Sequence, residues 1–239
     1  MPGKSSWKWV SELTESLFRL RCLRGVCVQC ARALLSRMSY FFILVTEDQM
    51  QSIRSIAIPP LTPDLERVLI DADTIQRRVT ELANQINKDY ADIDKPLILV
   101  GVLKGSFIYL ADLCRKLTVP HVVDFIAVSS YGKGSESSGN VRMLMDTREN
   151  LENHDVLIVE DILDTGYTLD YLVRNFTARG TKSVNTTVLL EKPDRYVVPV
   201  DLKYVGFTIP DVWVVGYGLD YGEQYRTLPY IAEMKIPQK

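Results

Sequence analysis

The sequence predicts an α/β fold in which helices flank a mostly parallel central sheet. Two apolar runs carry this prediction, residues 97–103 and 156–159, and we expect residues 184–190 to continue the sheet. Runs without polar alternation are typical of strands buried on both faces, as the strands of parallel sheets are. Both apolar runs lead into a polar turn and then into a helical pattern, which is the order of strand, turn and crossover helix.

The other elements follow in chain order. Residues 66–70 are a short strand candidate. Asp73 or Thr74 would then cap a helix with one apolar stripe, at positions 75, 79, 82 and 86. We expect a helix at 107–117, a strand at 122–128, a polar run at 129–139, a helix that ends before Gly180, and a last strand at 205–209.

The segment after the run at 156–159 carries the first sign of function. Glu160 and Asp161 follow the run, and the turn 164–168 leads into a helix. Ligands bind at the carboxyl ends of parallel strands and helix N-termini attract anions, so this arrangement predicts an anion site. The paired carboxylates could hold sugar hydroxyls or a bound metal. Solvated acids before an ordinary capped helix have the same spacing, and spacing alone leaves both interpretations open.

The composition limits the class of protein. The 239 residues are 46% hydrophobic, which is enough for one α/β core, and the formal net charge of −2 provides no global positive field for nucleic acid. No apolar run is long enough to predict a membrane span. Three of the four cysteines lie at 22, 27 and 30, without a second cysteine or histidine cluster to complete a zinc site. We therefore expect a cytoplasmic protein in a reducing compartment.

Residues 1–50 differ from the rest of the chain. Basic side chains outnumber acidic ones over 1–38, and apolar residues recur there at helical spacing. Two interpretations are open. One is an organelle-targeting or membrane-surface helix, and the other is a poorly ordered extension outside the fold, with Met38 or Met50 as the true start. We expect the folded domain to span residues 55–236.

Two strings of residues resemble a known family. Residues 160–168 (Glu-Asp-Ile-Leu-Asp-Thr-Gly-Tyr-Thr) resemble the loop that binds 5-phosphoribosyl 1-pyrophosphate (PRPP) in type I phosphoribosyltransferases. Residues 210–226 resemble the purine-binding hood of the hypoxanthine-guanine phosphoribosyltransferases, and the Lys-Pro-Asp-Arg and Gly-Tyr-Gly-Leu-Asp-Tyr strings are closer to the bacterial-type branch. The resemblance is collinear over 55–236. It implies the type I fold, with a small hood subdomain built from 55–70 and 208–236.

The resemblance also implies a role for each residue at the PRPP site. Glu160 and Asp161 would hold the ribose hydroxyls, directly or through Mg²⁺, and Asp164 would be the general acid/base at N7 of the purine. The bond before Lys104 is expected to be cis. The 5′-phosphate would lie in a cradle made by Asp164, Thr165, Gly166, Tyr167 and Thr168, and pyrophosphate would be bound by Lys104, Gly105 and Arg226.

The purine would be read by a second set of residues. Lys192 would donate to the exocyclic O6, which selects 6-oxopurines over adenine. Trp213 would stack on the base, where Phe or Tyr is more usual in the family, and the backbone carbonyls of Val214 and Asp220 would meet its other edge. The Asp220 carboxylate would hold a second Mg²⁺ on the pyrophosphate side. A flexible loop that starts at Ser130 and Tyr131 would close over the site.

The activity implied is transfer of the 5-phosphoribosyl group from PRPP to hypoxanthine or guanine, which yields IMP or GMP plus pyrophosphate in purine salvage. A homodimer or homotetramer is expected, with no nucleic-acid or membrane partner. One alternative is a PRPP-binding regulator that binds RNA, which would need a basic face. The other is a phosphoribosyltransferase for another base, such as orotate or adenine, against which Lys192 and the hood residues argue.

Overall fold

The computed structural model describes residues 62–131 and 140–235. The chain divides into two units, Met1–Ala57 and Ile58–Lys239, and every described residue belongs to the second. The predicted extension at residues 1–50 therefore lies outside the described residues, as do positions 132–139 of the predicted flexible loop.

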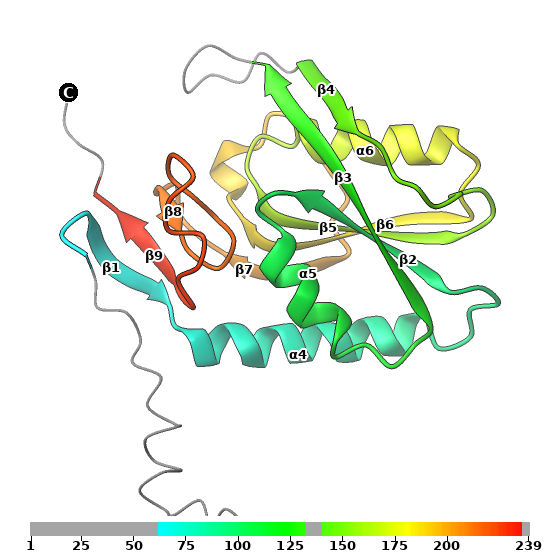
Figure 1. The fold of residues 1–239 in the computed structure, drawn as a ribbon, viewed down its shortest axis with the longest axis horizontal. Coiled ribbons are helices and arrows are strands. Elements are labelled where there is room, and N and C mark those ends of the chain that lie inside the picture. Colours follow the sequence, from blue (N-terminus) through cyan, green and yellow to red (C-terminus); the bar gives the residue numbers. More distant parts are fainter. Residues whose placement is uncertain (1–61, 132–139, 236–239) are drawn as a thin grey trace, which may run out of the picture. The chain divides into compact units, whose positions relative to one another are not determined.

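A six-stranded sheet of order β4-β3-β2-β5-β6-β7 forms the centre of the fold (Figure 1). Every neighbouring pair in it is parallel except β3 and β4. The mostly parallel sheet predicted from the apolar runs is confirmed. Its strands are β2 (Leu97–Leu103), β3 (His121–Tyr131), β4 (Asn140–Met145), β5 (Asp155–Leu163), β6 (Ser183–Glu191) and β7 (Tyr204–Thr208).

Helices cover both faces of this sheet, which explains why its central strands are apolar throughout. Successive side chains of a strand point to opposite faces. Leu97 and Leu99 of β2 pack in one core with α4 (Ala72–Asp89) and α5 (Phe107–Cys114). Ile98 and Val100 pack in the other core with α6 (Tyr167–Ala178). Figure 1 shows α4 and α5 on one side of the sheet and α6 on the other.

Several predicted boundaries were wrong. The cap of α4 is Asp71, whose carboxylate accepts from the backbone N–H of Thr74, and not Asp73 or Thr74. The strand β5 continues through Glu160 and Asp161 to Leu163, so the two acids lie within a strand that pairs with β6. The antiparallel edge strand β4 was not predicted.

Ser130 and Tyr131 belong to β3 and not to an irregular loop. Their backbones pair with Val141 and Asn140 of β4. The hairpin extends β3 beyond the predicted 122–128, because pairing with β4 gives the polar backbone after Val128 hydrogen-bond partners that isolated residues would lack.

A second, three-stranded antiparallel sheet has the order β1-β9-β8. Its strands are β1 (Leu65–Ile70), β8 (Val214–Val215) and β9 (Ile231–Met234), which come from both ends of the described chain. All three strands lie within 55–70 and 208–236, the segments from which the sequence analysis expects a hood.

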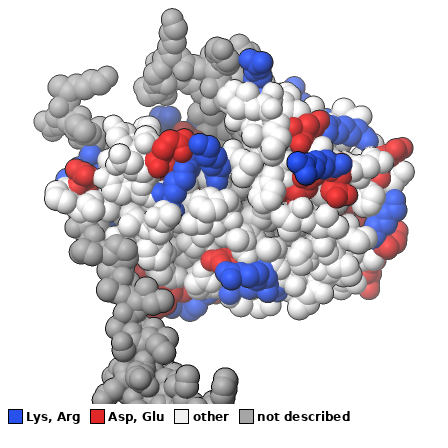
Figure 2. All heavy atoms as spheres, viewed as in Figure 1, with Lys and Arg blue, Asp and Glu red and all other residues white. Residues whose placement is uncertain are grey.

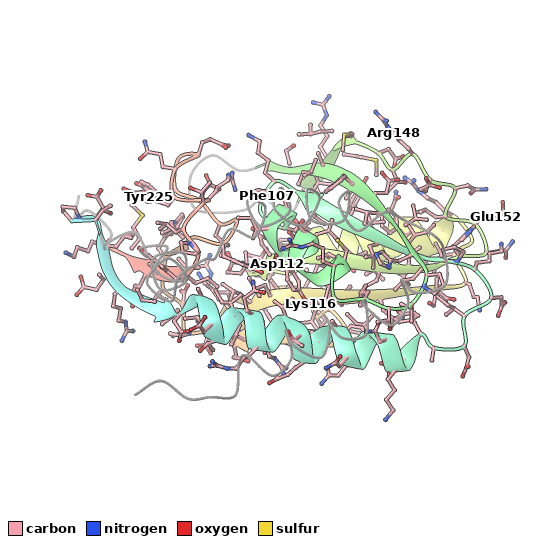
Figure 3. The ribbon with its side chains drawn as sticks, turned by 60° about the horizontal axis from the view of Figure 1, so that its bottom comes forward. Phe107, Asp112, Lys116, Arg148, Glu152 and Tyr225 are labelled. Atoms are coloured by element: carbon pink, nitrogen blue, oxygen red, sulfur yellow. The ribbon has the colours of Figure 1, made fainter. Side chains whose placement is uncertain are left out.

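A partly buried polar contact ties the hood segment to the helices. The carboxylate of Asp112 on α5 (Figure 3) accepts from the hydroxyl of Tyr217 at 2.6 Å and from the amide of Gln76 on α4 at 2.5 Å. Burial alone would raise the pKa of Asp112, but these hydrogen bonds, with that from Arg115, hold the pKa below its usual range. Tyr217 itself is buried and has a positive φ of 50°.

None of the helices within residues 62–131 and 140–235 is long and apolar enough to cross a membrane.

The apolar stripe of α4 generates a stability prediction. Leu82 is fully buried in the first core, whereas Gln85 on the same helix is exposed. Leu82→Ala should lower the free energy of unfolding by about 2–5 kcal/mol, because it removes methyl groups and leaves a cavity. Gln85→Ala should change it by less than about 0.5 kcal/mol. Urea denaturation measures both, and equal effects would show that the stripe does not contribute to the core.

Candidate active site

The acid pair Glu160–Asp161 is built into the carboxyl end of β5. Glu160 is buried, and the backbone N–H of Asp161 donates to its Oε1 at 3.3 Å. Burial, and then the neighbouring charge of Asp161, raise the pKa of Glu160; burial likewise raises the pKa of Asp161. In the described part of the chain, neither carboxylate has a cation within ion-pair distance. A buried Glu160 beside a half-buried Asp161, neither of them ion-paired among the described residues, favours the binding of a cation or of hydroxyl donors.

The turn after β2 lies directly against this pair. The Leu103–Lys104 peptide bond is cis, as expected from the family resemblance. At Gly105 there is no room for a side chain, because a Cβ would lie 1.5 Å from Oδ2 of Asp161. The buried hydroxyl of Ser106 donates to the carbonyl of Val102 and helps to fix the turn at the start of α5. Glycine at position 105 thus allows the two strand ends to meet.

The predicted phosphate cradle is the turn between β5 and α6. Gly166 has a φ of 91°, and a Cβ there would lie 2.2 Å from the carbonyl oxygen of Val198. The backbone N–H groups of Val197 and Val198 both donate to the carbonyl of Thr165 at 3.0 Å. The helix α6 begins at Tyr167, so its first N–H groups, which have no partner within the helix, open at this turn. This geometry suits an anion.

Two cations meet beside the acid pair, and both are held by carboxylates. Lys104 Nζ lies 3.1 Å from Oε2 of Glu223, and Arg226 Nη2 lies 3.2 Å from the same oxygen. Arg226 also pairs with Asp220 at 2.8 Å and donates to the carbonyl of Gly218. Its Nε is buried and has no hydrogen-bond partner within the described residues. An unpaired buried donor on a guanidinium is a suitable contact for a bound oxyanion.

Asp164 and Lys192 belong to a second group of charges. Arg195 Nε donates to Oδ1 of Asp164 at 2.9 Å, and its Nη1 lies 3.8 Å from Asp211. Asp211 in turn lies 3.7 Å from Nζ of Lys192, whose side chain is nearly buried. Charges therefore alternate along the series Asp164, Arg195, Asp211, Lys192.

Trp213 and Val214, which are also predicted to bind purine, differ from each other in exposure. Val214 is buried in β8, whereas Trp213 is 46% exposed, and its ring meets that of Tyr221 edge-on at 6.1 Å between centroids. Trp213 lines a small cavity of about 280 Å³ together with Asp211. The exposed ring face can stack on a planar ligand.

A cavity of about 350 Å³ unites most of the predicted site. Lys192, Trp213 and Val214 do not line it, and the side chains of Ser130 and Tyr131 are not described. Its lining includes Lys104, Gly105, Glu160, Asp161, Asp164, Thr165, Gly166, Tyr167, Thr168, Arg195, Asp220 and Arg226.

Comparison with known proteins decides the family. A family model for the phosphoribosyl transferase domain matches residues 70–222. The hypoxanthine-guanine phosphoribosyltransferase of Dictyostelium discoideum is 46% identical over 171 residues, which cover 70% of this chain and 94% of that protein. This chain belongs to the hypoxanthine-guanine phosphoribosyltransferase family. The hypoxanthine phosphoribosyltransferase of Salmonella typhimurium is also 46% identical, over 71% of this chain and 95% of that one.

Solved structures of the family share the fold. A hypoxanthine phosphoribosyltransferase from Staphylococcus aureus superposes with a TM-score of 0.69 at 46% identity, covering 72% of this chain and 92% of that one. A Trypanosoma cruzi hypoxanthine phosphoribosyltransferase superposes with a TM-score of 0.70 at 45% identity, covering 74% and 95%. The resemblance to the type I fold inferred from the sequence is thereby confirmed.

The family resemblance implied Mg²⁺, and the donors at this site fit it. The described residues contain no cluster of three or more acidic, histidine or cysteine side chains that could hold a metal ion. Mg²⁺ in phosphate sites is usually held by one or two carboxylates together with substrate phosphates and water, so a closed protein cage is not required. The adjacent side chains of Glu160 and Asp161, which both line the cavity, supply such carboxylates.

Three charged residues of the site were not assigned roles from the sequence: Arg195, Asp211 and Glu223. They lie within the strings that resemble the family, but their partners are distant in the chain. Their presence beside a Lys-Pro turn, an Ile-Pro turn and a Tyr-Gly turn was the available signal.

The bridge made by Glu223 generates a prediction about pyrophosphate. The hydrogen bond from Lys104, and then that from Arg226, hold the pKa of Glu223 below its usual range, so this carboxylate stays charged between two cations. An incoming anion must displace it. Glu223→Gln should therefore tighten pyrophosphate binding by about two- to fivefold, a modest change because the pair is exposed.

Isothermal titration calorimetry with Mg²⁺-pyrophosphate measures this affinity. Glu149→Gln removes an equal charge from an exposed residue without an ion pair in the described chain, and should leave the affinity unchanged. Weaker binding by Glu223→Gln would mean that the glutamate arranges the two cations for the ligand and does not compete with it.

Proposed function

We propose that this protein transfers the 5-phosphoribosyl group from PRPP to hypoxanthine or guanine, and so forms IMP or GMP and pyrophosphate in purine salvage. The observation that carries the proposal is the arrangement of one cavity: a pair of adjacent carboxylates, a helix N-terminus and two cations meet there. The ribose, the 5′-phosphate and pyrophosphate of PRPP require these three kinds of contact. Relatives that are 46% identical are named for this activity.

In the proposed mechanism, the protein acts mainly through position and charge. C1′ of the ribose becomes cation-like as pyrophosphate leaves, so groups fixed around it stabilise the transition state. Glu160 and Asp161 hold the ribose hydroxyls, and the turn 164–168 holds the 5′-phosphate. Lys104 and Arg226 bind the departing pyrophosphate once Glu223 releases them. Bound Mg²⁺ would neutralise charge on pyrophosphate, with Glu160, Asp161 and Asp220 as the protein carboxylates near it.

The base is recognised by the second group of charges. Asp164 takes the proton of N7, and Lys192 donates to O6. With adenine, the buried ammonium of Lys192 would face an amino group that cannot accept its hydrogen bond, which is costly. Trp213 stacks on the ring, and the backbone carbonyls of Val214 and Asp220 accept from its opposite edge. The loop after Tyr131 closes over the bound substrates and excludes water, which would otherwise hydrolyse PRPP.

The face of the molecule shown in Figure 2 gives no support to an RNA-binding regulator. On the face shown in Figure 2, basic and acidic side chains occur in mixed groups, and no broad basic area appears among the described residues of that face. Proteins that bind the phosphate backbone of RNA need a broad basic area on their surface. Lys192, which directly follows β6, argues against a phosphoribosyltransferase for adenine, because the amino group of adenine cannot accept a hydrogen bond from it.

Assembly and location are parts of the same proposal. We propose a cytoplasmic homodimer or homotetramer, with residues 1–50 outside the catalytic fold. The edge strand β4 exposes Leu144 and Met145, whose side chains are 62% and 43% exposed. Exposed apolar side chains on an edge strand favour association with another copy.

The test of this function is a pyrophosphate-release assay with PRPP, Mg²⁺ and one base at a time: hypoxanthine, guanine, xanthine, adenine or orotate. Hypoxanthine and guanine should react. Adenine should be slower by about 10⁴-fold, because a site built to hydrogen-bond one substrate group rejects the analogue that cannot pair with it. Equal rates with adenine would overturn the role of Lys192, and no release with either oxopurine would overturn the function.

A further inference from the structure

The contact between Arg195 and Asp164 is not accounted for by substrate binding alone. Arg195 Nε lies 2.9 Å from Oδ1 of Asp164, and Nη2 lies 3.5 Å from Oδ2, so the guanidinium meets both carboxylate oxygens. Both side chains line the cavity. Among the described residues, no other side chain forms a hydrogen bond with the Asp164 carboxylate. Arg195 therefore fixes its orientation.

The backbone holds Arg195 in place. It ends the short 3₁₀ turn Pro193–Arg195, and its N–H donates to the carbonyl of Lys192 at 2.9 Å. The N–H of Lys192 donates in turn to the carbonyl of Leu163, the residue before Asp164. The segment that carries Arg195 is thus hydrogen-bonded to the end of the strand that carries Asp164. Asp211, 3.8 Å from Nη1, holds the far side of the guanidinium.

An arginine suits this position better than a lysine. Its planar fork can meet two carboxylate oxygens at once, whereas an ammonium is a point charge on a flexible stem. The hydrogen bond with Asp164, and then the charge of that residue, raise the pKa of Arg195, so the guanidinium stays positive. A fixed cation keeps the carboxylate in one orientation until a proton arrives.

We propose that Arg195 is a positioning residue that aims the Asp164 carboxylate at N7 of the bound purine. The inference rests on the proposed function. In the step concerned, N9 of the base forms a bond to C1′ while the bond from C1′ to the pyrophosphate oxygen breaks. The electron pair of that bond leaves with pyrophosphate, and the N7 proton passes to Asp164. Arg195 acts on the last transfer only, through the orientation of its acceptor.

A double-mutant cycle tests this assignment. The variants are Arg195→Gln, Arg195→Lys, Asp164→Asn and Arg195→Gln with Asp164→Asn. The rate measured is single-turnover formation of IMP from hypoxanthine and PRPP, because product release can mask chemistry in steady state. PRPP affinity is measured separately by calorimetry. Arg174→Gln, which removes an exposed Arg–Asp pair on α6, is the matched control.

Arg195→Gln should slow the single-turnover rate by about 10- to 100-fold, as expected of a misaligned group, while PRPP affinity changes less than about twofold. Arg195→Lys should recover part of the rate. In the Asp164→Asn background, loss of Arg195 should cause no further slowing, since its effect passes through that carboxylate. Arg174→Gln should match the wild type.

Two results would overturn the inference. Equal slowing in both backgrounds would show that Arg195 acts on the substrate itself, and a collapse of PRPP affinity in Arg195→Gln would make it an anion ligand. Circular dichroism and Tm identify a variant that has lost its fold. If Arg195→Gln is such a variant, Arg195→Lys is compared with the wild type instead. An unchanged single-turnover rate in Arg195→Lys would then contradict the positioning role. If wild-type protein forms no nucleotide, the proposed function fails, and this inference with it.

Discussion

The site depends on the close approach of Gly105 to the carboxylate of Asp161. Gly105 lies just after β2 and Asp161 lies near the carboxyl end of β5, and these two neighbouring parallel strands align 98–101 with 156–159. A Cβ at position 105 would overlap the Asp161 oxygen, so only glycine permits the contact. The approach brings the turn that carries Lys104 against the acid pair. Cationic and anionic contacts for one ligand are thereby placed within a single cavity.

A second consequence is that opposite charges lie close together without neutralising one another fully. Glu160 is buried and Asp161 is half-buried, and neither has a cation within ion-pair distance in the described residues, whereas Lys104 and Arg226 are held by Glu223 and Asp220. In a low-dielectric cavity such a distribution favours a ligand that carries anionic groups beside hydroxyls or a bound cation. The small net charge of the chain gives no hint of this local separation.

The central elements could be predicted because their signals are local. The run at 97–103 is buried on both faces, and its helix-covered position follows from the lack of alternation. The edge strand β4 could not, because its residues gain a structure only by pairing with β3 across the segment 132–139. The acids at 160 and 161 were placed after a strand, since charged residues are poor strand formers; pairing with β6 overrides that preference.

The parts of the candidate site that consist of one short sequence segment, such as the turn 164–168, were predictable. The contacts of Asp164 with Arg195, and of Lys192 with Asp211, join different strings, and a spacing in one sequence does not specify them. The resemblance to the family supplied roles for single residues. It did not supply the ion pairs that hold those residues before substrates arrive.

The most direct test of this account is the affinity of Gly105→Ala for PRPP with Mg²⁺, measured by calorimetry. The added methyl group must push the Asp161 carboxylate aside, and a carboxylate end can move, so the fold should persist while PRPP affinity falls at least about tenfold. Gly180, beyond α6, has a positive φ of 75°, so Gly180→Ala introduces backbone strain away from the cavity and controls for a general loss of stability: PRPP affinity should not change. Unchanged PRPP affinity in Gly105→Ala would contradict the account.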